Sequence, residues 1–384
     1  MERLGAGIIG YGFIGKVHCF GYHSIPFFYA PAPLAVQLVS VATSRRETAE
    51  AARTQGGFAA ATDDWRELIA DPRVQIVHIC SPNVMHAEQL VAAMAAGKHI
   101  YCDKPLTATR VESETVQRAM AGWKGIGQMT LQYRFITAVQ RAKQLIEEGY
   151  IGSAIGFRGV YLHSGSVDPS TPLRWKHRGA DGGGVLRDLG PHLFDLVDWL
   201  AGPVVEMLAS TRILHARRPD GKGGMEDVDR EDQAVITARL AGGALGTLEV
   251  SKIATGAEDD LRLEIHGDRG ALRFSLMDPD FLEAYSLSDP ETPAGGNRGW
   301  KRIATLQRYG SPAVFPAPRS TAGWLRAHTH CLHEFLCAVA EGRQGEPSLE
   351  RGIELQLMID CAERSAAAGS WQKVRRPAAL PRKH

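Results

Sequence analysis

Residues Gly10–Gly15 read Gly-Tyr-Gly-Phe-Ile-Gly, directly after the short apolar run Ala6–Ile9. The segment that follows, Lys16–Tyr22, can continue as a helix. A buried strand, a glycine-rich turn and a helix in this order are the context in which the pattern G-x-G-x-x-G indicates dinucleotide binding. We therefore expect a nucleotide site at this turn.

Each glycine of the turn has a separate task. Gly10 permits the tight turn, Gly12 lets the backbone approach a pyrophosphate, and Gly15 lets the helix pack closely on the strand. Phe13 and Ile14 lie at the helix N-terminus, whose N–H groups and positive dipole end favour phosphate. All five are predicted to contact the cofactor or to shape its site.

Strand and helix patterns alternate over the first 130 residues. Apolar runs at 36–42, 74–80, 99–102 and 126–131 are separated by helical patterns at 47–53, 63–69 and 85–96, and by a helix that ends near 121. This alternation predicts a doubly wound parallel (Rossmann) α/β sheet with ligands at the carboxyl ends of its strands. A dinucleotide-binding domain is expected over residues 1–130.

Residues 131–384 have a different pattern. After a helix at 138–148, alternating strand patterns appear at 155–162, 205–214, 233–240, 245–253, 261–266 and 271–274, with helices at 193–200, 324–341 and 349–368. The pattern predicts an α+β domain for substrate binding and oligomerisation, with a large, mainly antiparallel, open-faced sheet. Because its open face needs covering, we expect a homo-oligomer, a dimer or tetramer.

Composition excludes several classes of protein. A net charge of +1 with 44% hydrophobic and 23% charged residues is typical of an ordinary globular protein and argues against a nucleic-acid partner. No apolar run approaches the ~18 residues that would span a membrane, and no signal peptide is recognised. The six cysteines form no CxxC pair and are expected to be buried thiols in a cytoplasmic protein.

The first crossover carries an unusual aromatic and proline-rich segment at residues 25–33. Packing over the sheet edge is one explanation. A wall over the mouth of the cofactor or substrate site is the other.

Residues of the types needed to oxidise a carbinol stand directly after the predicted strands. Such chemistry needs a held nicotinamide and a base for the hydroxyl proton. Lys104 follows the strand at 99–102, in a turn stiffened by Pro105, where its ammonium can hydrogen-bond the reacting oxygen. The alternative is an exposed loop lysine.

Asp188 and His192 are spaced i, i+4 at the start of an expected helix, so both side chains should project from one face. Imidazole titrates near neutrality, which suits His192 as the base, while Asp188 orients the substrate or stabilises the protonated ring. The glycine run 182–184 leaves room for the nicotinamide to approach. Helix capping and a core histidine are the alternatives.

Four motifs in register resemble the glucose–fructose oxidoreductase/inositol dehydrogenase (Gfo/Idh/MocA) family, over essentially the whole chain. They are Gly10–His18, Ser81–His86, Gly97–Pro105 and Gly182–His192. The resemblance implies that Lys104, Asp188 and His192 are catalytic and also contact substrate. Two residues depart from the family pattern, because Asp103 stands where Glu is usual and Gln132 where Asn is frequent. Residues 25–33, 172–176 and 228–232 further resemble the levoglucosan dehydrogenase-like branch.

Further candidates line the same strand ends. Ser81, Asn83, His86, Asp103, Lys104 and Gln132 are predicted to contact the cofactor, and helix capping is an alternative for Asn83. Arg134, Trp175 and Lys176 are predicted to bind substrate, with Trp175 stacking on a pyranose or, alternatively, lying in the core.

Cofactor choice depends on the end of the second strand, where NAD enzymes often place an acid. Here Ser44 and Arg45 suit a 2′-phosphate, which favours NADP, whereas the levoglucosan-type resemblance favours NAD.

No metal is expected. His330 and Glu334 have i, i+4 spacing, but a metal site needs three or four converging ligands, and this stretch lies far from the nucleotide motifs in the sequence.

We thus predict an NAD(P)-dependent dehydrogenase or reductase acting on a sugar, anhydrosugar or cyclitol hydroxyl. The alternative is an NAD-dependent glycoside hydrolase of the same fold. A non-catalytic nucleotide sensor is disfavoured by the presence of Lys104, Asp188 and His192 together.

Overall fold

The computed structural model describes residues 3–376. By their contacts these residues form two compact units. The first comprises the chain up to Phe135 together with Gln307–Gln356, and the second comprises Ile136–Leu306 together with the chain from Leu357 onward. The predicted boundary at residue 130 lies near the first junction, but residues 307–356 group with the first unit.

A six-stranded parallel sheet forms the centre of the first unit, in the order β3-β2-β1-β4-β5-β6. Its strands are β1 (Arg3–Ile9), β2 (Ala35–Ala42), β3 (Ala60–Thr62), β4 (Ile76–Ile79), β5 (His99–Cys102) and β6 (Gly127–Met129). The order reverses between β1 and β4, which confirms the predicted doubly wound sheet. β3 has three residues, too few for a recognisable apolar pattern.

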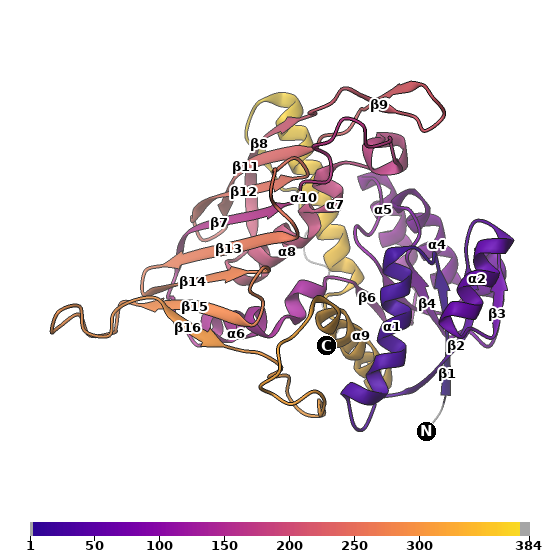
Figure 1. The fold of residues 1–384 in the computed structure, drawn as a ribbon, viewed down its shortest axis with the longest axis horizontal. Coiled ribbons are helices and arrows are strands. Elements are labelled where there is room, and N and C mark those ends of the chain that lie inside the picture. Colours follow the sequence, from indigo (N-terminus) through magenta and orange to yellow (C-terminus); the bar gives the residue numbers. More distant parts are fainter. Residues whose placement is uncertain (1–2, 377–384) are drawn as a thin grey trace. The chain divides into compact units, whose positions relative to one another are not determined.

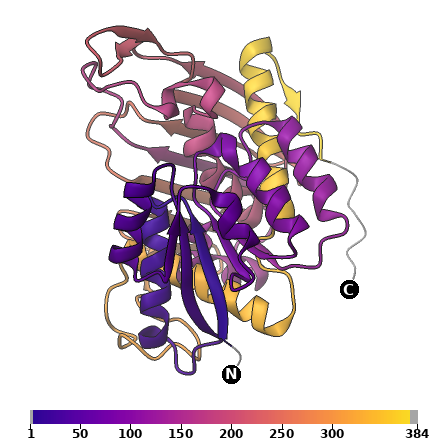
Figure 2. The ribbon, with the colours of Figure 1, turned by 90° about the vertical axis from the view of Figure 1, so that its right-hand side faces the viewer.

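Helices lie on both sides of this sheet (Figure 2). On one side α1 (Phe13–Phe28) contacts α2 (Arg46–Gly56) and α9 (Trp324–Glu341). On the other, α4 (Asn83–Ala95) contacts α3 (Trp65–Ala70) and α5 (Arg110–Met120). α9 comes from the C-terminal part of the chain, and its Phe335 ring lies 5.1 Å from that of Tyr101 on β5.

The aromatic segment at 25–33 packs within the first unit. α1 continues through Pro26 to Phe28, and the following Tyr29 is 1% exposed. The Tyr29 hydroxyl receives a hydrogen bond from Arg326 and lies 2.8 Å from Nδ1 of His330, both on α9. Packing within the first unit therefore accounts for Tyr29, whereas Phe27 of the same segment is 71% exposed, and a wall over the cofactor or substrate site stays a prediction.

The second unit contains a nine-stranded sheet in the order β16-β15-β14-β13-β7-β12-β11-β8-β17, which Figure 1 shows from β8 to β16. The pair β7 and β12 is parallel and the other pairs are antiparallel, as predicted. The strands are β7 (Ala154–Leu162), β8 (Val204–Arg212), β11 (Gln233–Leu240), β12 (Leu245–Ser251), β13 (Asp260–Gly267), β14 (Gly270–Ser275), β15 (Phe281–Ser286), β16 (Lys301–Ala304) and β17 (Gln372–Lys373). A separate hairpin joins β9 (Arg217–Pro219) to β10 (Met225–Asp227).

One face of this sheet is covered and the other is open. α6 (Thr137–Glu147), α7 (Val185–Asp188) and α8 (Gly190–Leu200) contact the covered face, and α10 (Leu349–Ala368) runs from the first unit into the second. Side chains on β11 alternate between buried and solvent-facing positions. On the open face Val235 and Leu245 are each 48% exposed.

Two features of the described residues concern the chain's environment. Within residues 3–376 there is no helix with the length and apolar character needed to cross a membrane. In the same residues the six cysteines are free thiols, and all but Cys337 are buried.

Candidate functional site

The glycine turn has the shape that its sequence predicts. Gly10 has φ +88°, and a Cβ at Gly15 would lie 2.1 Å from the carbonyl oxygen of Gly10, so both positions require glycine. A Cβ at Gly12 would meet no described atom within 4 Å. Gly12 is the N-cap of α1 and has no side chain that could cap the helix. The first backbone N–H groups of α1 are therefore offered as donors beside open space. This arrangement fits the pyrophosphate of a dinucleotide.

The helix that follows this turn presents its first two side chains differently. Phe13 is 74% exposed and its ring lies 5.5 Å from that of Trp324, whereas Ile14 is half-buried against the core of the first unit.

The carboxyl ends of the parallel strands lie along one edge, as their backbone hydrogen bonds show. Gly10 N–H donates to Ala42 (2.8 Å), Cys80 N–H to Ile9 (2.8 Å) and Asp103 N–H to Ile79 (2.9 Å). The predicted cofactor residues follow these ends: Ser44 and Arg45 after β2, Ser81 and Asn83 after β4, Asp103 and Lys104 after β5. The structure thus brings this predicted set together at one edge.

His86 joins two turns of this edge. It is fully buried, with Nε2 2.9 Å from the carbonyl oxygen of Ser81 and Nδ1 2.9 Å from that of Pro105. Burial lowers the pKa of His86, although the backbone carbonyls oppose this effect. The ring therefore positions the Ser81 and Lys104 turns, and its direct contact with a cofactor stays a prediction.

Several details differ from the sequence-based expectations. Pro82, not Asn83, is the N-cap of α4, so the capping explanation for Asn83 is wrong. β6 ends at Met129, so Gln132 and Arg134 lie in the 3₁₀ helix η1 (Gln132–Phe135) rather than at a strand end. Gln132 is buried there, whereas Arg134 and Lys104 are half-buried.

Asp188 and His192 do not share one helix, contrary to expectation. α7 ends at Asp188 and α8 begins at Gly190, with Leu189 between them. Pro191 stands in the first turn of α8. Because proline lacks the N–H that a continuous helix would need and its ring clashes with the preceding turn, the chain breaks at this point.

Two lysines hold the Asp188 carboxylate. Nζ of Lys176 and Nζ of Lys252 each lie 2.8 Å from Oδ2 of Asp188. The Lys252 side chain is 13% exposed and that of Asp188 15%, whereas Lys176 is 43% exposed. Nζ of Lys176 also lies 5.6 Å from the ring of Trp175, which is half-buried rather than a core residue.

The glycine run 182–184 serves the fold of this loop. A Cβ at Gly183 would lie 2.5 Å from the carbonyl oxygen of Lys176, and Gly184 has φ +113°. These contacts explain the glycines by the packing of the loop itself. That the run also leaves room for the nicotinamide ring stays a prediction. Next to it Arg187 forms an ion pair with Glu363 (2.6 Å), which fastens α7 to α10.

His192 is 5% exposed, and its ring lies 6.0 Å from that of Tyr161. The Tyr161 hydroxyl donates to Oδ1 of Asp259 (2.7 Å), and Nε2 of His163 lies 3.2 Å from the same oxygen. Burial raises the pKa of Asp259, but the hydrogen bonds from His163 and Tyr161 and the histidine charges outweigh it, so the net shift is downward. A carboxylate therefore faces the His192 side of the site.

At the end of β2, Ser44 and Arg45 are both exposed. The neighbouring Arg46 instead pairs with Glu50 (2.7 Å). Between β2 and α2 the chain thus presents one cationic side chain and no acid.

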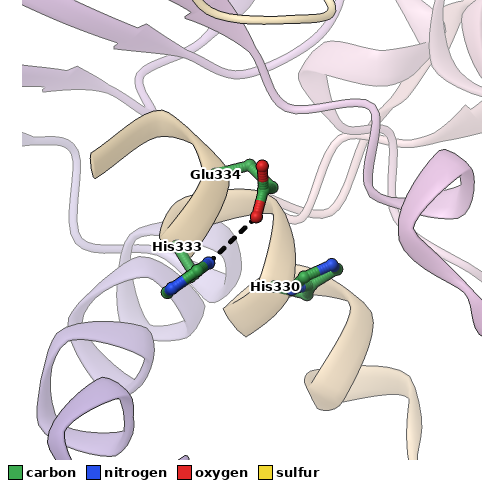
Figure 3. Close-up of side chains that lie close together, drawn as sticks. All are labelled: His330, His333 and Glu334. Atoms are coloured by element: carbon green, nitrogen blue, oxygen red, sulfur yellow. Dashed lines mark hydrogen bonds and ion pairs between the residues drawn. The ribbon is translucent and has the colours of Figure 1, made fainter. Parts of the chain in front are cut away.

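His330, His333 and Glu334 place their ligand atoms within 4.8 Å of one another on α9 (Figure 3). The two imidazole planes differ by 13°, and Nδ1 of His333 is 3.0 Å from Oε1 of Glu334. Imidazole lone pairs lie in the ring plane, so nearly parallel, offset rings do not converge on one ion. Burial lowers the pKa of His330 to about 3. These contacts explain the cluster as packing and hydrogen bonding with Tyr29, and the absence of a metal stays a prediction.

Two family descriptions match successive parts of the chain. Residues 4–129 match the oxidoreductase family with an NAD-binding Rossmann fold, and residues 139–273 match the GFO/IDH/MocA C-terminal domain. The chain belongs to the GFO/IDH/MocA oxidoreductase family. The family resemblance seen in the sequence is thereby confirmed.

Named relatives of this GFO/IDH/MocA oxidoreductase include levoglucosan dehydrogenase of Pseudarthrobacter phenanthrenivorans, 35% identical over 97% of this chain and 99% of the relative. Myo-inositol 2-dehydrogenase of Thermotoga maritima is 29% identical over 69% of this chain and 73% of the relative. A solved structure of levoglucosan dehydrogenase in complex with NADH and levoglucosan has a TM-score of 0.93 at 34% identity, covering 98% of this chain and 100% of that one.

Sequence reasoning about this GFO/IDH/MocA oxidoreductase missed Lys252. The apolar pattern 245–253 predicts a strand through this position, where a lysine would face solvent or the core. β12 instead ends at Ser251, and the chain turns at Lys252. The available signal was its place directly after a strand, which indicates a site residue only once β12 is known to run parallel to β7.

Proposed function

We propose that this GFO/IDH/MocA enzyme oxidises a ring hydroxyl of a sugar, anhydrosugar or cyclitol, with nicotinamide as the hydride acceptor. The observation that carries the proposal is the group of Asp188, Lys176 and Lys252, in which Asp188 stands four residues before the buried His192. Charged donors and acceptors of this kind suit a polyhydroxylated ring. The levoglucosan and inositol dehydrogenases among its relatives support this substrate class and favour it over the hydrolase alternative.

Three residues have distinct proposed roles. His192 takes the hydroxyl proton, Lys104 donates a hydrogen bond to the reacting oxygen, and Asp188 orients the substrate. Because Asp188 is held by two ammonium groups, it is a poor base, which leaves that task to the imidazole. Trp175, Lys176 and Arg134 are proposed to complete the substrate site.

The test is an absorbance screen at 340 nm with NAD and NADP against levoglucosan, inositols, glucose and xylose. Reduction of cofactor with one of these sugars supports the proposal. Release of a free sugar from a glycoside without net cofactor reduction would favour the hydrolase instead.

We further propose that the 2′-phosphate of NADP binds Ser44 and Arg45. The exposed guanidinium and the lack of an acid after β2 support NADP, whereas the levoglucosan dehydrogenase solved with NADH favours NAD. Arg45→Ala should then lower kcat/KM for NADP at least tenfold and leave the value for NAD within about twofold. Arg46→Ala, which removes a guanidinium paired with Glu50, is the matched control. Equal losses for both cofactors would contradict the proposal.

A homo-oligomer is also proposed, formed through the open face of the nine-stranded sheet. Val235 and Leu245 lie exposed on that face, where a second copy would cover them. We expect light scattering after size exclusion to give a dimer or tetramer mass, and Val235→Glu to lower it. Val235→Thr, which keeps the shape without a charge, should retain the wild-type mass. A monomeric wild type would overturn the proposal.

The free cysteines and the lack of a membrane-spanning helix within residues 3–376 support a cytoplasmic location, which we propose on that ground.

A further inference from the structure

Lys252 is fixed on both sides of its own backbone. Its N–H donates to the carbonyl oxygen of Asp232 (2.8 Å), and its carbonyl oxygen accepts from the N–H of Ser166 (2.9 Å). It directly follows β12, whose parallel neighbour β7 ends at the same edge of the sheet. The side chain therefore begins from a defined point beside the loop that carries Lys176.

The Lys252 ammonium is placed where burial would be costly without a carboxylate. With 13% of its side chain exposed, it loses most of its hydration, and Asp188 at 2.8 Å compensates for that loss. Lys176 contacts the same oxygen but is 43% exposed, so its ion pair is screened by water and contributes less. Of the two, Lys252 is the more effective holder of Asp188.

Two ammonium groups contact the Asp188 carboxylate. Two acids lie on either side of this group: Glu231 accepts a hydrogen bond from the N–H of Leu186 on α7, and Asp259 interacts with His192. The ammonium charges disfavour protonation of nearby acids and imidazoles, and the two carboxylates oppose this effect. The positive charge of Lys252 also contributes to lowering the pKa of His177 to about 4, after burial and Arg218. Its effect thus reaches beyond the residue it contacts.

We infer that Lys252 is a positioning residue for the oxidation reaction, holding the Asp188 carboxylate ionised and oriented and keeping the proton-accepting side of the site unprotonated towards lower pH. The inference rests on the proposed function. It assigns separate tasks to the two lysines, because the more exposed Lys176 remains able to move towards a substrate hydroxyl while Lys252 keeps Asp188 in place.

The test compares Lys252→Gln and Lys252→Arg in the full-length protein, with the sugar and cofactor identified by the screen. The Gln variant should lose kcat/KM about tenfold or more, and the acid limb of its pH profile should move up by about one pH unit, because removal of a positive charge beside the site favours protonation of the base, His192, and a nearby charge shifts a titration by about 1–3 units. The Arg variant keeps the charge, so its acid limb should stay at the wild-type position. Lys301→Gln is the matched control, because Lys301 is also ion-paired, with Asp289 at 2.5 Å, but stands on β16.

The outcomes are separable. An unmoved acid limb in Lys252→Gln, with wild-type activity present, overturns the inference and leaves the proposed function standing. Equal acid-limb shifts in the Gln and Arg variants also overturn it, since the charge would then not be responsible. A wild type that reduces neither cofactor with any sugar refutes the proposed function, and the inference with it. If the Gln variant fails to fold, the Arg variant decides. An altered acid limb in Lys252→Arg overturns the inference, and an acid limb at the wild-type position supports it.

Discussion

Replacing His192 by Asn is expected to lower kcat about a thousandfold with the sugar and cofactor found in the screen. Removal of a general base typically costs 10²–10⁴-fold in rate. His192 is 5% exposed, so water does not readily take its place. Steady-state kinetics over pH 6–10 measure the effect, and the residual rate should rise with pH as hydroxide replaces the missing base.

Two controls distinguish a lost base from a damaged fold. Cofactor affinity, measured by fluorescence titration, should remain within about threefold of wild type, because the residues proposed to bind the nucleotide lie in the other unit. His266→Asn, at a half-exposed histidine on β13, should retain full activity. A loss of less than tenfold in His192→Asn would remove His192 from the proposed mechanism.

Acidification from pH 7 to pH 5 is expected to destabilise the protein by on the order of 4 kcal/mol through two histidines alone. Burial lowers the pKa of His18 and of His330 to about 3 each. In the unfolded chain both bind a proton near pH 6.5, so between pH 6.5 and 3 the unfolded state binds more protons. The stability they contribute is therefore present above pH 6.5 and is lost as the pH falls.

His78, in contact with His18 (3.1 Å between Nδ1 atoms), adds to the effect, since burial lowers its pKa as well. A total stability of about 5–15 kcal/mol leaves little reserve against such a loss. Urea unfolding followed by tryptophan fluorescence at pH 7, 6 and 5 measures the slope.

His330→Gln removes one titrating ring and keeps an acceptor for the Tyr29 hydroxyl, so its stability should fall less steeply with acid. His266→Gln, at the half-exposed position, serves as the matched control and should keep the wild-type slope. Equal unfolding midpoints at pH 7 and pH 5 in the wild-type protein would contradict this account.

Much of the first unit could be predicted because its signals are local. The turn Gly10–Gly15 specifies a strand, a tight turn and a helix within a few residues, and the later strands repeat the pattern. α9 and α10 have the bounds that their apolar periodicity predicts. The break between Asp188 and His192 has a local signal as well, since Pro191 stands between them, whereas the i, i+4 spacing by itself predicts a continuous helix.

The sequence by itself determined the doubly wound sheet, the family, and the edge at which the residues from Gly12 to Lys104 gather, because parallel strands place the residues that follow them at a common edge. Tertiary structure alone decided that α9 packs with the first unit and that Lys252 reaches Asp188. Both depend on contacts between residues distant in the chain, with 64 positions separating Asp188 from Lys252 (252 minus 188). Helix and strand periodicity has a range of a few residues, so it cannot encode which distant charge a carboxylate will meet.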